Sequence, residues 1–226
     1  MLKDNLLKVL HNIKNGNNLG EKIYLVGATK TMPVETINNA TSLGLEIVAE
    51  NKVSEFREKH GKIINAKEHF IGHLQTNKVK YIVGQVELIH SVDSLHLAQA
   101  ISDRANKIGV TQDILVQINV GKEETKSGFY PDIAIESVKA IAQLQNINVC
   151  GLMAMLPPTD DQGLLKKLCL QMREFFDKLN NDGYNLKYLS VGMSADYQIA
   201  IQNGSNMIRL GSTIFGKRNY DIGETK

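Results

Sequence analysis

Ile23-Tyr24-Leu25-Val26-Gly27-Ala28-Thr29-Lys30 is an apolar, β-forming run that ends on a lysine. Such a run is typical of a strand buried on both faces of a parallel sheet. Lys30 lies where the strand ends, shortly before Pro33 opens the next segment. An amine in such dry surroundings has a lowered pKa and can attack an aldehyde. By itself, however, the run fits a surface lysine after a core strand better than a reactive amine.

The same pattern recurs along the whole chain. Seven more strand-like segments follow, at 46–51, 69–74, 88–93, 113–120, 148–156, 188–193 and 207–215. Helix-like segments separate them, at 33–43, 52–60, 77–83, 94–107, 131–144, 159–181 and 194–202. Eight βα units joined by short loops predict an α/β protein with a single closed (β/α)8 TIM barrel, and an open doubly wound sheet is the alternative. We expect one domain over residues 1–226 with an amphipathic helix at about 2–15.

Composition excludes several classes of protein. The 226 residues carry 26 Lys and Arg against 24 Asp and Glu, a net charge of +2 that gives no reason to expect nucleic acid or an acidic membrane as partner. No apolar run is long enough to span a bilayer, and the charged start does not resemble a signal peptide. Cys150 and Cys169 lie in apolar settings and are expected to be reduced core residues. We therefore expect a soluble cytoplasmic protein.

Active sites of such barrels lie at the carboxyl ends of the strands. The side chains expected there include Lys30, Glu50, Asn51, His73, Asp93, Lys126, Met193, Ser194 and Arg209. Glu50 and Asn51 either contact a ligand or cap the next helix. Lys126 is either a second amine that could receive an aldehyde or a solvated charge, and its position on a loop favours the solvated charge. His69 and His73 lie on a strand without nearby cysteines or paired carboxylates, so no metal site is expected.

Arg209 is the second distinctive residue. Side chains alternate along a strand, so packing of Ile208 and Leu210 against the outer helices turns Arg209 into the barrel. A buried charge needs a partner. One possibility is an internal ion pair with Glu50 or Asp93, and the other is a ligand.

Gly192-Met193-Ser194 and Gly211-Ser212-Thr213 lie at the ends of the seventh and eighth strand-like segments. Loops at those places commonly bind phosphate through backbone N–H groups. A reactive lysine, an inward arginine and a phosphate site together suggest pyridoxal 5′-phosphate. Lys30 would form the Schiff base, Ser194, Gly211, Ser212 and Thr213 would hold the phosphate, and Arg209 would face the pyridine nitrogen. Because arginine only donates hydrogen bonds, that nitrogen would stay unprotonated, which favours holding the cofactor over carbanion chemistry.

At these residues the chain resembles the pyridoxal phosphate homeostasis proteins, the YggS/PROSC group. The matching segments are LVGATK (25–30), AENKVSE (49–55), HFIGHLQTNK (69–78), IHSVDS (89–94), ETKSGF (124–129), GLMAMLP (151–157), SVGMSADYQIAI (190–201) and IRLGSTIFGKR (208–218). The resemblance implies a barrel like the N-terminal domain of alanine racemase. It also implies cofactor linkage through Lys30, with contacts from Asn51, Met193, Ser194, Arg209, Gly211, Ser212 and Thr213. Ala195 departs from the commonest pattern, in which an acidic residue is frequent there.

The same resemblance bears on activity. In alanine racemase the tyrosine that opposes the lysine comes from a C-terminal domain of the partner subunit, and this sequence stops soon after the eighth strand. We therefore expect a cofactor-homeostasis protein without substantial turnover, which has no catalytic residues, is a monomer, and passes its cofactor to apo forms of pyridoxal phosphate enzymes. The alternatives are an amino-acid racemase or Schiff-base aldolase on the same barrel, and a sugar-phosphate-binding barrel.

Overall fold

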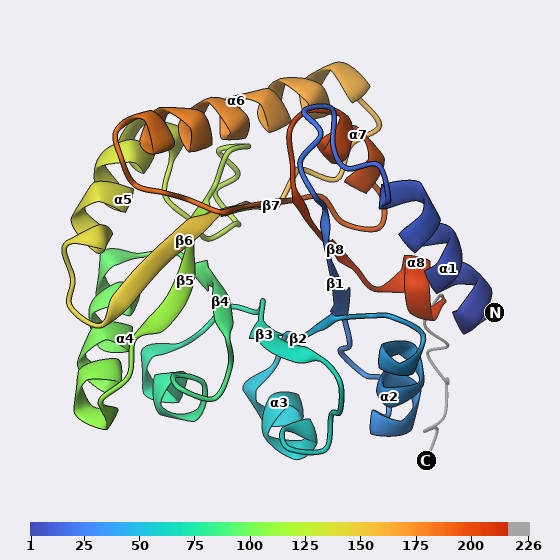
Figure 1. Cartoon of the computed structure of the whole chain (residues 1–226). Helices are drawn as coiled ribbons and strands as arrows, with labels where there is room; N and C mark the ends of the chain where they lie inside the picture. Colours follow the sequence, from blue (N-terminus) through green and yellow to red (C-terminus); the bar gives the residue numbers. More distant parts are fainter. Residues whose placement is uncertain (217–226) are drawn as a thin grey trace, which may run out of the picture.

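Eight parallel strands close into a barrel in the computed structural model, which describes residues 1–216. The strands are β1 (Tyr24–Ala28), β2 (Ile47–Glu50), β3 (Lys67–Phe70), β4 (Leu88–Val92), β5 (Gln112–Ile118), β6 (Ile147–Ala154), β7 (Tyr188–Val191) and β8 (Met207–Leu210). They pair in chain order, and β8 pairs with β1 to close the ring (Figure 1). The predicted (β/α)8 barrel is confirmed, and the open-sheet alternative is wrong.

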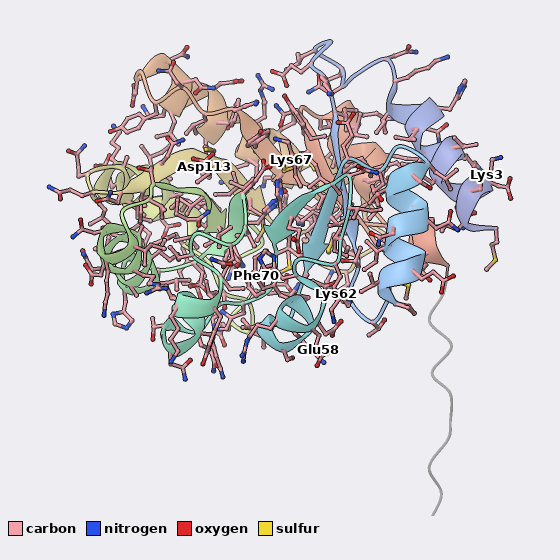
Figure 2. The ribbon with its side chains drawn as sticks, turned by 60° about the horizontal axis from the view of Figure 1, so that its bottom comes forward. Lys3, Glu58, Lys62, Lys67, Phe70 and Asp113 are labelled. Atoms are coloured by element: carbon pink, nitrogen blue, oxygen red, sulfur yellow. The ribbon has the colours of Figure 1, made fainter. Side chains whose placement is uncertain are left out.

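Helices surround the barrel (Figure 1). They are α1 (Leu2–Ile13), α2 (Val34–Ser42), α3 (Val53–Lys59), α4 (Leu95–Ile108), α5 (Ala134–Ala142), α6 (Gln162–Asn181), α7 (Tyr197–Gln202) and α8 (Ser212–Phe215), with 3-10 turns η1 (Thr76–Tyr81) and η2 (Pro131–Ile133). Charged side chains such as Lys3 and Glu58 point away from the barrel (Figure 2). No helix within residues 1–216 is both long and apolar enough to cross a membrane.

Three expected elements differ most from the structure, and several others differ by up to three residues at their ends. The third strand was expected at 69–74, but β3 begins and ends earlier, and residues 71–75 form the loop after it. The eighth strand ends at Leu210, and α8 occupies the rest of the 207–215 segment. The segment at 77–83 forms the 3-10 turn η1, not an α-helix. Residues 217–226, which include the end of the expected domain and of the 208–218 motif, lie outside the described residues.

The alternation of side chains along the strands divides the core into two layers. Val26, Ile47, Leu115, Met153 and Met207 fill the barrel interior. Residues of opposite parity pack outward, where Leu25, Ile208 and Leu210 meet the buried side of α1. Interior residues near the carboxyl ends of the strands therefore point toward the loops at that end of the barrel.

Helix α1 covers the part of the barrel where β8 meets β1. The last helix within residues 1–216, α8, has only four residues and cannot cover β8 by itself. Leu6, Val9 and Ile13 of α1 are buried in the same cluster as Ile208 and Ile214. Asn5 also donates a hydrogen bond to the carbonyl of Ile214. The helix expected at about 2–15 is thus part of the barrel wall.

Candidate cofactor site

A cavity of about 370 Å³ opens at the carboxyl ends of the strands. Its walls come mainly from β1, β8 and the turns after β7 and β8. The lining residues are Ala28, Lys30, Met32, Asn51, Ile71, Met155, Met193, Ser194, Ala195, Arg209, Gly211, Ser212, Phe215 and Gly216. The structure thus brings together seven of the eight residues expected at the cofactor. The eighth, Thr213, is not part of the lining, and its backbone N–H donates to Ser194 Oγ over 3.3 Å.

Lys30 lies in the turn after β1 and reaches the cavity on the side to which alternate residues of that strand point. Val26 lies in the interior core, while Ala28 and Lys30 line the cavity above it. Gly27 and Thr29 face outward, and a Cβ at Gly27 would meet the side chain of Leu45 at 2.6 Å. The amine thus comes from a fixed wall of the barrel.

Arg209 lies inside the barrel, as the alternation predicted, with 5% of its surface exposed. Its Nη1 donates to the carbonyl and hydroxyl oxygens of Ser190 over 2.7 and 2.6 Å, and its Nη2 donates to the carbonyl of Ala154 over 2.9 Å. Burial lowers the pKa of Arg209 to about 10, and Asp196 opposes that shift, so the side chain remains charged at neutral pH.

The ion pair considered for Arg209 is not formed. Glu50 points outward from β2 and pairs with Lys59 over 2.7 Å, while Asp93 lies 2.9 Å from His73 Nδ1. Among residues 1–216, no carboxylate lies within ion-pair distance of Arg209. A buried guanidinium held only by neutral oxygens is costly in an apolar interior. An acceptor in the cavity would offset part of that cost.

Two buried histidines extend the contacts of Arg209 across the barrel. His90 Nδ1 lies 3.3 Å from Ser190 Oγ, and His90 Nε2 lies 3.0 Å from His69 Nδ1. Burial lowers the pKa of His69 to about 3 and that of His90 well below its ordinary value, with Arg209 and His69 adding to the effect on His90. Both rings are therefore neutral. The sequence analysis considered His69 only as a metal ligand and missed His90, because nothing local marks an interior histidine that bonds to another strand.

Gly211 leaves space that a side chain would fill. Its φ of −111° is not in the left-handed region that favours glycine. A Cβ would lie 3.5 Å from the carbonyl oxygen of Ala28, in the cavity wall. Backbone at this turn can therefore approach a ligand closely. Together with Ser194 and Ser212, it provides the kind of cradle that suits phosphate.

The remaining expected residues lie elsewhere. Glu50 is behind the barrel wall and neither lines the cavity nor caps α3, whose N-cap residue is Lys52. His73 lines a separate surface groove. Lys126 pairs with Glu123 over 3.4 Å and is outside the cavity lining.

Neither cysteine belongs to this site. Burial raises the pKa of the Cys150 and Cys169 thiols to about 12. Both cysteines are unpaired, and the described residues contain no group of three or more side chains suited to a metal ion.

Comparison with known proteins places this fold in a class. Residues 5–219 match the family model of the alanine racemase N-terminal domain. A pyridoxal phosphate homeostasis protein of Aquifex aeolicus is 42% identical over 200 residues, which cover 87% of each chain. One of Pasteurella multocida is 32% identical over 229 residues, covering 97% of this chain and 98% of the other. The chain therefore belongs to the pyridoxal phosphate homeostasis protein family, within the class of alanine racemase N-terminal-domain barrels.

Solved structures agree with that assignment. PipY of Synechococcus elongatus, solved with pyridoxal phosphate bound, superposes with a TM-score of 0.84 at 27% identity, covering 96% of this chain and all of the other. An alanine racemase of Clostridium difficile superposes with a TM-score of 0.79 at 23% identity, which shows the shared fold alone. This chain covers 58% of that racemase.

Proposed function

We propose that this protein binds pyridoxal 5′-phosphate as a Schiff base on Lys30 and serves in homeostasis of the cofactor without substantial turnover. The observation that carries the proposal is the cavity itself, where Lys30, the buried cation of Arg209 and the turns at Ser194 and Gly211 converge. The homeostasis name of relatives up to 42% identical and the pyridoxal phosphate in PipY support it.

Each group has a defined part in this proposal. When bound, the cofactor supplies an aldehyde, with which the Lys30 amine condenses to an imine and one water. The phosphate is held by Ser194, Gly211 and Ser212, and Thr213 supports Ser194 through its backbone N–H. Asn51, Met193 and Arg209 surround the ring. Arg209 keeps the pyridine nitrogen unprotonated, since a guanidinium has donors only and remains charged at neutral pH.

The cavity lining also favours holding over turnover. Racemisation needs acid and base groups on opposite faces of the reacting carbon. Within residues 1–216, Lys30 and Arg209 are the charged side chains of the lining, which contains no tyrosine, histidine or carboxylate. Lys30 can exchange a proton on one face only. We therefore assign no catalytic residue.

Borohydride trapping tests the binding proposal. Protein mixed with pyridoxal phosphate should show Schiff-base absorbance, and reduction should leave a pyridoxyl group on Lys30, located by peptide mass. Lys30→Ala should abolish both signals, while the matched control Lys126→Ala should retain them. Trapping that persists in Lys30→Ala, or wild-type protein that takes up no cofactor, would show that the proposal is wrong.

An amino-acid racemase assay on the loaded protein tests the absence of turnover. We expect enantiomer exchange near the rate of free cofactor, and robust turnover would make the protein an enzyme. We also propose that the protein delivers its cofactor to apo enzymes, which a transfer assay checks. We propose further that it is a monomer, which light scattering checks, and that it is cytoplasmic, which cell fractionation checks.

A further inference from the structure

Lys30 occupies a β-turn that is unfavourable for its sequence. The N–H of Met32 donates to the carbonyl of Thr29 over 3.0 Å, so Lys30 and Thr31 are the two central residues of the turn. Thr31 has a φ of +66°, while Lys30 is not among the residues with positive φ. This is the pattern of a type II turn, whose third position favours glycine. A β-branched threonine there is strained.

Side chains of α3 hold both ends of that turn. Lys59 Nζ donates to the carbonyl of Thr29 over 2.9 Å, and Glu55 Oε2 accepts from the backbone N–H of Thr31 over 2.6 Å. The two side chains also meet each other, with Lys59 Nζ 3.3 Å from Glu55 Oε2. The peptide groups before and after Lys30 are therefore both bonded to one helix.

Glu50 of β2 fixes the same assembly from the barrel side. Its Oε1 accepts from Lys59 Nζ and from Thr29 Oγ1, each over 2.7 Å. The ammonium group of Lys59 thus uses its three donors on Thr29, Glu50 and Glu55. Lys59 and Glu50 are only 9% and 5% exposed. Burial raises the pKa of Glu50, while Lys59 and Thr29 act against that shift.

From these contacts we infer that Lys59 and Glu55 are positioning residues for Lys30. They hold the strained turn so that the amine leaves the barrel wall at one fixed place, which lowers the entropy lost when it captures an aldehyde. The inference rests on the proposed role of Lys30. Neither residue lines the cavity, so each acts through the backbone of the turn.

The test measures affinity for pyridoxal phosphate, from Schiff-base absorbance, beside unfolding by urea. Glu55→Ala should weaken affinity roughly tenfold, while Glu55→Gln should stay near wild type because its amide oxygen still accepts from Thr31. Glu58→Gln, on the exposed side of α3 (Figure 2), is the control and should change neither quantity.

A second background separates positioning from general stabilisation. Thr31→Gly removes the strain at the positive φ, so Glu55→Ala should cost less than about threefold in affinity when combined with it. Lys59→Met should also weaken the affinity for pyridoxal phosphate. If the Lys59→Met variant does not fold, the Glu55 variants alone test the inference. Variants that lose stability but bind the cofactor as wild type does would overturn the inference. If wild type itself forms no Schiff base, the proposed function fails instead.

Discussion

At the residue scale, the charge state of the barrel interior depends on a chain of hydrogen bonds. Arg209 is an obligatory donor to Ser190, whose hydroxyl hydrogen can then point to His90 Nδ1. In that arrangement His90 carries its proton on Nε2 and donates to His69 Nδ1. The interior then holds a single positive charge, and that charge borders the cavity. Protonation of either histidine would place a second cation there.

The two buried histidines predict that acid lowers the free energy of unfolding. His69 has an ordinary pKa of 6.5, which the unfolded chain retains, and a pKa of about 3 in the folded protein. The unfolded state therefore binds more protons between these values, so stability is full above pH 6.5 and falls as pH decreases. One such histidine contributes a slope of about 1.4 kcal/mol per pH unit. His90 adds to the loss in the same direction.

Urea unfolding between pH 7.5 and 5 measures this slope. His69→Gln keeps an acceptor for His90 Nε2 and should make the slope shallower, by about 1.4 kcal/mol per pH unit at the acid end of this range and hardly at all at pH 7.5. His96→Gln, on the exposed face of α4, should leave it unchanged. Equal slopes in wild type and His69→Gln would contradict the assignment of a neutral buried His69.

Gly211 yields a prediction about affinity without a change in fold. Gly211→Ala adds a methyl group 3.5 Å from the Ala28 carbonyl, at ordinary contact distance, but inside the cavity. We expect affinity for pyridoxal phosphate to fall about tenfold, or about 1.4 kcal/mol, with little change in unfolding. Gly109→Ala is the opposite case, since its φ of +69° strains alanine while its Cβ meets nothing within 4 Å. It should lower stability by about 1–2 kcal/mol and leave affinity unchanged.

At the element scale, α1 replaces the outer helix that α8 is too short to provide. Leu6 and Leu7 are neighbours on α1, yet Leu6 is fully buried and Leu7 is 46% exposed. Leu6→Ala should therefore cost about 3 kcal/mol in the free energy of unfolding, and Leu7→Ala less than about 1 kcal/mol. Chemical denaturation of the two variants checks this. Similar losses would mean that α1 does not cover the barrel as described.

Strands and helices were predictable where the apolar residues follow a single regular spacing. Strand β1 was found because it lies in a continuous apolar run. The start of α4 has a local signal as well, since Ser94 caps that helix by accepting from the N–H of Leu97. The end of β8 was missed because Ile214 and Phe215 prolong the apolar run, although Gly211 interrupts it. In η1, a short polar segment gave no helical period to distinguish the two helix types.

The site was predictable in part for a similar reason. Arg209 could be placed inside the barrel by alternation alone, but Ser190 and His90 come from other strands and become its neighbours only through closure of the barrel. Lys59 did leave a local signal. It follows buried Phe56 by three residues, so the helical period places a lysine on the apolar face of α3. A lysine at such a position needs buried partners.

At the scale of the whole molecule, the pairing of β8 with β1 determines when the site forms during folding. Lys30 belongs to the first βα unit, while Ser194 and Gly211 belong to the last two. Under the proposed function, a growing chain thus makes the amine early but cannot enclose the phosphate of the cofactor beside it until the eighth strand joins the first. A cofactor held by the first unit and the last two units would link distant parts of the chain, and this link would lower the entropy of the state in which the barrel is open. Cofactor retention would therefore report that the eighth strand has joined the first.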